Sequence, residues 1–426
     1  MEPGDWVRVK TKKGVFEGIL LPRSEFYSKD FVSIKLKDGY NIGIRKREII
    51  EMKRLKKKVK LEKFPRRRIK VREGLPEIGL VATGGTIASR LDYLTGGVKM
   101  AFSPEEILFA VPELQEMVSI KEMRLLFNLA SEDMTPREWV KIAREVGRQL
   151  KKVRGAIVTH GTDTMHFTSA ALSFMVQTSK PIVLTGAQRS SDRGSSDAFS
   201  NLLAAARVAG YSDLGEVVVV FHEGLGDDKF FALRGTRVRK MHTERRDAFR
   251  SINTPPLLRI YRDGRMEPLS EYRKFKDEKP KVDARFEEKV ALVKVYPGSD
   301  PGILDYYAEK GFKGIIIEGT GFGHVPTQTL RRKDSWIPKV RRWAKEGIFV
   351  GVTSQTIYGR TNPLVYRNLR LLSRAGAVHL EDMLSEVAYV KLGWVLAHKD
   401  WDPKEMMLRN FAGEMSEKSE IGGYLI

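Results

Sequence analysis

Residues 78–88 read IGLVATGGTIA, an apolar run that stops at a pair of glycines followed by a threonine. The same order recurs at 155–165 (GAIVTHGTDTM) and at 181–189 (PIVLTGAQR). Short Val/Ile/Leu runs of this kind are typical of buried strands, and the glycines that follow let the backbone turn sharply. These three stretches therefore predict strands that end at the same kind of turn.

Helical patterns separate the predicted strands, at 104–110, 136–150 and 169–177. Apolar strands that alternate with helices favour a parallel sheet covered on both faces, so we predict an α/β fold with a larger domain at 76–288. A charged, weakly periodic break follows at 251–289, and apolar runs then return. We predict from them a second, smaller α/β domain at 289–426.

Residues 5–52 have a different pattern, with about five short alternating runs and an Asp38-Gly39 pair typical of a tight hairpin. This spacing predicts a small, closed, SH3-like β-barrel over 1–55, although an extension of a larger sheet would give the same pattern. Residues 56–75 are predicted to be a basic linker.

The net charge of the 426 residues is +21, with 75 Lys/Arg and 54 Asp/Glu. Residues 45–72 alone carry +12, whereas residues 81–426 carry +9, a mild excess over 346 residues. The basic segment is either a contact for a phosphate backbone or a solvated linker. The chain has no cysteine, which excludes disulfides and thiolate catalysis and fits a reducing compartment. Without a basic-then-apolar leader or an apolar run of about 18 residues, a cytoplasmic protein is expected.

The carboxyl ends of parallel strands are where function gathers in such sheets. Thr86, Thr162 and Asp163 follow two of the predicted strands, and a threonine hydroxyl needs a base to become a nucleophile. Lys240, in RGTRVRKMH at 234–242, is a candidate for that base. His160 is expected to serve the backbone turn, and Asp197 and Asn201 are either cap and packing residues or ligands.

TGGTIA at 83–88 and HGTDTM at 160–165 resemble the two signature motifs of the bacterial-type L-asparaginase/glutaminase family, and SEDMTP at 131–136 and TGAQR at 185–189 resemble further blocks of it. The resemblance implies a pair of α/β domains and no metal. Its implied catalytic residues are Thr86, Thr162, Asp163 and Lys240. Its implied substrate-binding residues are Ser131, Glu132 and, on a mobile lid, Tyr93.

An asparaginase-like chain with a basic N-terminal barrel resembles the glutamine-hydrolysing subunits of archaeal tRNA-dependent amidotransferases. That resemblance implies ammonia transfer to a partner subunit that binds Glu-tRNA(Gln) and activates it with ATP and Mg²⁺. No cofactor is expected in this chain, and a homodimer capped by two partner subunits (α2β2) is expected. A free-standing L-asparaginase/glutaminase and a non-catalytic RNA-binding scaffold are the alternatives.

Overall fold

The computed structural model describes residues 1–22, 28–37, 40–56, 73–84, 89–91, 98–100, 111–189, 195–419 and 421–424. The predicted helix at 104–110 and the Asp38-Gly39 turn lie outside these residues. No helix in the described part of the chain is long and apolar enough to cross a membrane.

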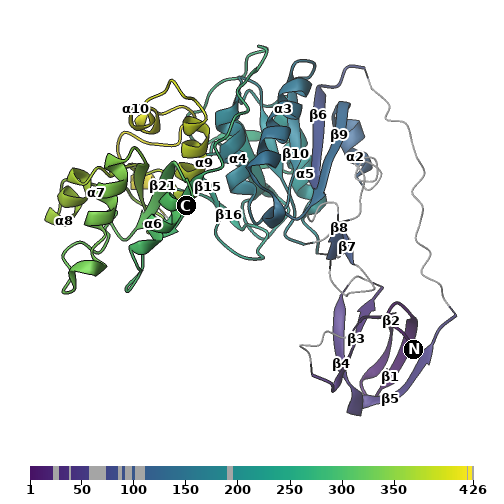
Figure 1. Ribbon diagram of the computed structural model, residues 1–426. Coiled ribbons are helices and arrows are strands. Elements are labelled where there is room, and N and C mark those ends of the chain that lie inside the picture. The colour runs from purple at the N-terminus through teal and green to yellow at the C-terminus, as the bar shows by residue number, and fades with distance from the viewer. Residues whose placement is uncertain are drawn as a thin grey trace.

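The N-terminal unit is a five-stranded antiparallel sheet of order β4-β3-β2-β1-β5 that curls around its own core (Figure 1). Val7, Val9, Ile34 and Ile44 are buried inside it. No pairing between described residues joins β4 to β5, so the barrel is open along that seam rather than closed as predicted. Its elements are β1 (Trp6–Thr11), β2 (Gly14–Leu20), β3 (Phe31–Leu36), β4 (Asn41–Arg45), η1 (Lys46–Glu48) and β5 (Ile49–Arg54).

An eight-stranded sheet of order β18-β17-β14-β13-β12-β10-β6-β9 forms the larger α/β unit. Five strands, from β13 to β9, are parallel as predicted, but the pairings among β13, β14, β17 and β18 are antiparallel. The α/β fold is confirmed, and the sheet departs from the predicted parallel arrangement at this edge. The bounds are β6 (Glu77–Gly84), β9 (Ser119–Leu129), β10 (Gly155–Thr159), β12 (Ile182–Thr185), β13 (Val217–His222), β14 (Lys229–Arg234), β17 (Leu258–Tyr261) and β18 (Met266–Pro268).

Helices cover both faces of this sheet (Figure 1). On one face lie α3 (Pro136–Leu150) and α4 (Met165–Met175), and on the other α2 (Pro112–Met117) and α5 (Ala198–Tyr211). Three small two-stranded sheets complete the unit: β7 (Ser89–Leu91) with β8 (Val98–Met100), β11 (Val176–Gln177) with β19 (Lys281–Val282), and β15 (Val238–Lys240) with β16 (Phe249–Ser251). The short helix η3 (Ser131–Asp133) follows β9.

The C-terminal unit is a four-stranded parallel sheet of order β20-β21-β22-β23. Its α9 packs against α4 of the larger unit, so the two α/β units share one hydrophobic core. The elements are β20 (Val290–Lys294), α6 (Gly302–Glu309), β21 (Gly314–Gly319), η4 (Arg332–Asp334), α7 (Ile337–Lys345), β22 (Phe349–Ser354), α8 (Arg367–Arg374), β23 (Val378–His379), α9 (Ser385–Leu396), α10 (Pro403–Leu408) and η5 (Ile421–Gly423).

Candidate active site

Three neighbouring parallel strands, β6, β10 and β12, end level with one another. Thr159, the last residue of β10, pairs with Ala82 on one side and with Thr185 on the other. The Thr83 hydroxyl donates a hydrogen bond to the Thr159 carbonyl at 2.9 Å. Gly84, at the end of β6, has φ of 111°, a conformation that side-chain-bearing residues rarely adopt. The loops that follow these strands therefore start from one edge of the sheet.

Lys240 reaches this edge from β15, and its ammonium group joins the two predicted residues of the second loop. Lys240 Nζ lies 2.9 Å from Thr162 Oγ1 and 2.6 Å from Asp163 Oδ1. Thr162 is buried and the Lys240 side chain is 10% exposed, whereas the Asp163 side chain is 64% exposed. A hydroxyl beside an amine and a carboxylate is the arrangement that activates a threonine nucleophile or orients a water.

Ser131 lies against the same loop. Thr164 Oγ1 donates to the Ser131 carbonyl at 2.7 Å. A Cβ on Gly161 would lie 2.8 Å from the Ser131 Cβ, so only glycine allows this approach. Ser131 is buried, and its hydroxyl is 3.4 Å from Glu132 Oε2, while Glu132 is exposed. The structure thus brings Ser131 and Glu132 to the Thr162 loop.

Two of the predicted site residues, Thr86 and Tyr93, lie outside the described residues. Their assigned roles stay predictions. The structure therefore brings together five of the seven predicted residues: Thr162, Asp163, Lys240, Ser131 and Glu132.

His160 serves the backbone turn. Its Nδ1–H donates to the Gly161 carbonyl at 2.7 Å, which leaves Nε2 to accept from the Thr168 hydroxyl at 2.9 Å. The ring is completely buried, and burial lowers its pKa to about 4. His160 is therefore neutral at neutral pH.

Behind Lys240 lies a buried charged cluster that the sequence did not indicate. Arg239 Nη1 donates to Glu386 Oε2 at 3.3 Å, and Glu386 Oε1 is 3.9 Å from His166 Nε2. Burial raises the pKa of Glu386, and burial followed by the charges of Arg239 and Lys240 lowers the pKa of His166 to about 3. Because Glu386 belongs to α9, this cluster connects the C-terminal unit to the strand that carries Lys240.

Asp197 and Asn201 hold the third loop. Asp197 accepts hydrogen bonds from the backbone N–H groups of Gln188 and Arg189, at 3.1 and 3.0 Å. Asn201 Nδ2 donates to the Gly186 carbonyl at 3.0 Å. Both side chains are fully buried, so they act as packing and loop-holding groups.

Thr164, Arg239, His166 and Glu386 were missed by sequence reasoning. Thr164 could have been found, because it lies inside the HGTDTM motif. The other three carry no motif, and the alternation of β15 only predicts that Arg239 and Lys240 point to opposite sides. Among the described residues no three His, Asp or Glu side chains converge as metal ligands would, and a metal-free site stays a prediction.

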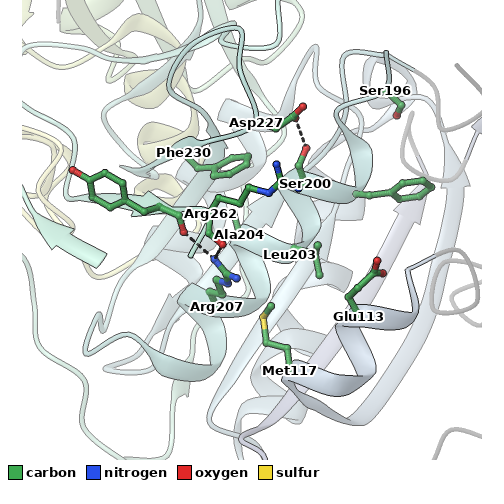
Figure 2. Close-up of a pocket in the computed structure, with 12 residues that line it drawn as sticks. Glu113, Met117, Ser196, Ser200, Leu203, Ala204, Arg207, Asp227, Phe230 and Arg262 are labelled. Carbon is green, nitrogen blue, oxygen red and sulfur yellow. Dashed lines mark hydrogen bonds between the residues drawn. The ribbon is translucent and has the colours of Figure 1, made fainter. Parts of the chain in front are cut away.

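A cavity of about 390 Å³ lies apart from these residues, between α5, α2 and the strands β14 and β17 (Figure 2). Its floor is apolar, with Leu203 and Phe230. Across its mouth Arg207 donates to the backbone carbonyls of Tyr261 and Arg262. None of Ser131, Thr162, Asp163 and Lys240 lines it, so it is not the catalytic cleft.

Three family models match the chain. Residues 77–272 match the asparaginase N-terminal domain, residues 289–407 the glutaminase/asparaginase C-terminal domain, and residues 1–55 the GatD N-terminal domain.

Curated relatives match over nearly the whole length. The GatD subunit of glutamyl-tRNA(Gln) amidotransferase from Pyrococcus abyssi is 49% identical, with 99% of this chain and 97% of the relative covered. The protein of the same name from Methanopyrus kandleri is 46% identical, with 99% and 93% covered. Among solved structures, the thermostable L-asparaginase from Thermococcus kodakarensis has a TM-score of 0.71 at 30% identity, covering 80% of this chain and 100% of that one. L-asparaginase I from Vibrio cholerae has a TM-score of 0.68 at 27% identity, with 80% and 99% covered.

The fold and the converging Thr162, Asp163 and Lys240 define an asparaginase-type amidohydrolase. With its N-terminal sheet, the chain belongs to the GatD family, the asparaginase-like subunits of glutamyl-tRNA(Gln) amidotransferase.

Proposed function

We propose that this chain hydrolyses glutamine by threonine nucleophilic catalysis and passes the ammonia to a partner subunit, which converts Glu-tRNA(Gln) to Gln-tRNA(Gln). The observation that carries the proposal is the contact of Lys240 with Thr162 and Asp163. The relatives' name supports the tRNA-linked role, since they match 99% of this chain, the N-terminal sheet included.

The proposed chemistry begins with a threonine hydroxyl that attacks the side-chain amide carbon of glutamine. Lys240 takes up the hydroxyl proton in its neutral form, and a proton reaches the amide nitrogen as ammonia leaves. Water then hydrolyses the glutamyl ester and releases glutamate. Either Thr162 or Thr86 is the attacking group. The other belongs to the set that relays protons or orients the water.

Ser131 is assigned to the α-amino and α-carboxyl groups of the substrate. Two contacts support this role, because its buried hydroxyl lies beside the Thr162 loop and its carbonyl accepts from the Thr164 hydroxyl. Glu132 is exposed beside it and supplies the charge for the α-amino group. Backbone N–H groups at the glycine turns stabilise the oxyanion that forms on the amide oxygen.

ATP and Mg²⁺ are proposed to act in the partner subunit, where the glutamate on the tRNA is activated. This chain then needs no cofactor of its own. The chain has no GxxxxGK[ST] phosphate-binding loop, which supports that division of labour. The cytoplasmic location expected from the sequence stays a prediction.

The assembly is proposed to be a homodimer with two partner subunits. Exposed apolar side chains of the C-terminal unit support a second copy as one neighbour. Phe322 and Tyr366 have ring centroids 6.3 Å apart, and Leu364 and Val365 beside them are 66% and 52% exposed. Sedimentation of the purified chain tests this, and a monomer at micromolar concentration would contradict it.

A free-standing L-asparaginase/glutaminase is the second candidate, favoured by the TM-score of 0.71 with a solved L-asparaginase. The deciding experiment measures ammonia release from glutamine and from asparagine, with and without the partner subunit and Glu-tRNA(Gln). Glutamine hydrolysis that rises with the partner and the tRNA supports our proposal. Asparagine hydrolysis that ignores both would overturn it.

A further inference from the structure

The net charge of the α/β body is concentrated on one part of the C-terminal unit. Residues 331–346 and 367–374 hold ten Lys/Arg and two Asp/Glu, a net of +8, against +9 for all of residues 81–426. The helices α7 and α8 carry seven of these basic residues and no acidic one. The excess is therefore a local patch and not a mild background.

The two helices lie side by side at the outer end of the C-terminal unit (Figure 1). Gly376, just after α8, comes so close to α7 that a Cβ there would lie 2.6 Å from the Ala344 Cβ. Lys345 follows Ala344, and Arg374 precedes the Gly376 turn, so the basic ends of the two helices meet. We call the exposed side of α7 and α8 the cationic face.

Little in the described part of the chain neutralises the cationic face. Arg342 pairs with Glu346, and Lys339 pairs with Asp305. Arg341, Lys345 and Arg374 are exposed and have no ion pair among the described residues. Like charges three or four positions apart destabilise a helix, as do cations at its N-terminal end, where α8 begins with Arg367. A surface built only for stability would intersperse acids.

The composition of the cationic face favours a nucleic acid over a protein. The apolar residues of both helices that are buried, Val340, Trp343, Leu369 and Leu372, point into the core of the unit, which leaves a polar exterior. Protein interfaces have cores depleted in charge. Nucleic-acid interfaces are strongly positive, and arginine suits phosphate because its fork donates two hydrogen bonds.

We propose that the cationic face of α7 and α8 binds the sugar-phosphate backbone of the tRNA whose glutamate is amidated. The proposal rests on the proposed function for the identity of the RNA. It is independent of the basic segment at 45–72.

The test uses the complex of the full chain with its partner subunit. In one variant Arg341, Lys345 and Arg374 are all changed to Gln. Arg367 and Arg370 are kept, because Arg367 adjoins the apolar Tyr366 and Arg370 donates to the Leu364 carbonyl. A control variant carries Gln at Lys151, Lys279 and Lys281, three exposed lysines on other elements. The Kd for Glu-tRNA(Gln) is measured from 50 to 200 mM KCl.

We expect the slope of log Kd against log salt to fall by about 2 to 3 in the α7/α8 variant, since each phosphate contact contributes about 0.9. The Kd at 100 mM salt should rise about tenfold or more, with the control close to the wild type. Glutamine hydrolysis without tRNA should be equal in all three proteins, which shows that they are folded.

Equal slopes in the two variants would overturn the proposal. Weaker binding of the partner subunit with an unchanged tRNA slope would also overturn it, and would assign the face to a protein. A wild-type complex that binds tRNA but releases no ammonia from glutamine would sink the proposed function alone. A wild-type complex that binds no tRNA would overturn both.

Discussion

Lys240 Nζ lies 2.6 Å from Asp163 Oδ1 and 2.9 Å from Thr162 Oγ1, so a single amine contacts both a nucleophile candidate and its carboxylate neighbour. Replacing Lys240 by Met keeps the length of the side chain but removes the base. We expect kcat for glutamine hydrolysis to fall by about 10² to 10⁴, the usual contribution of a general base, with little change in KM. Lys229→Met, the same change in the half-buried strand β14, should leave kcat near the wild-type value. A Lys240→Met enzyme with wild-type kcat would remove the lysine from the mechanism.

Thr162→Val tests the hydroxyl itself, because valine has nearly the same shape. We expect ammonia release to fall by at least about 10²-fold while the fold and the complex with the partner are kept. Thr178→Val is the matched control, since Thr178 is as buried as Thr162, at 7% exposure, but its hydroxyl caps the Lys180 N–H. Retained activity in Thr162→Val would leave Thr86 as the sole nucleophile candidate.

Gly161→Ala tests the approach between the catalytic loop and the Ser131 turn. The new methyl group would lie 2.8 Å from Ser131 Cβ and 3.0 Å from its hydroxyl, so the two loops must separate. We expect KM for glutamine to rise, and the free energy of unfolding to fall by about 1 to 3 kcal/mol. Gly224→Ala meets no atom within 4 Å and should change neither quantity. An unchanged KM would show that Ser131 does not position the substrate.

Local signals in the sequence predicted some elements to the residue. The helix α3 begins and ends at Pro136 and Leu150 as predicted, because Thr135 and Glu138 form a capping box and Pro136 occupies the first turn. The strand β9 was missed, since its eleven residues alternate irregularly between buried and exposed. The strands β17 and β18 were also missed, because they are three or four residues long and only half buried at the sheet edge.

The site could be predicted where the motif and the strand end coincide, as at Thr162 and Asp163. Lys240 was chosen by its stretch of sequence, and its contacts put it beside both of them. Glu386 could not be predicted, because it is 146 positions beyond Lys240 and reaches the cluster only through the packing of α9 on α4. Contacts of this kind depend on tertiary structure and leave no local pattern.

His160 predicts a loss of stability in acid. Burial lowers the pKa of the folded imidazole from 6.5 to about 4. Between these values the unfolded chain binds a proton that the folded chain does not, so the free energy of unfolding falls as the pH drops from about 6.5 to about 4. For this one group the fall is about 3 kcal/mol. Denaturant unfolding at several pH values should show a shallower fall for His160→Asn. Parallel profiles for the two proteins would contradict this account.

Lys391 and Glu414 form an ion pair with both side chains fully buried, at 2.7 Å, which ties the chain after α10 to α9. Lys391 also donates to the Met407 and Arg409 carbonyls. Removing one partner leaves a buried charge without compensation, so Lys391→Met should lower the free energy of unfolding by about 3 to 5 kcal/mol. Lys274→Met breaks a pair of similar length that is about 60% exposed, and should cost about 1 kcal/mol or less. Denaturant unfolding of both variants measures the difference. Equal losses would mean that the buried charge of Glu414 finds another partner, and that the chain after α10 is not held by this pair.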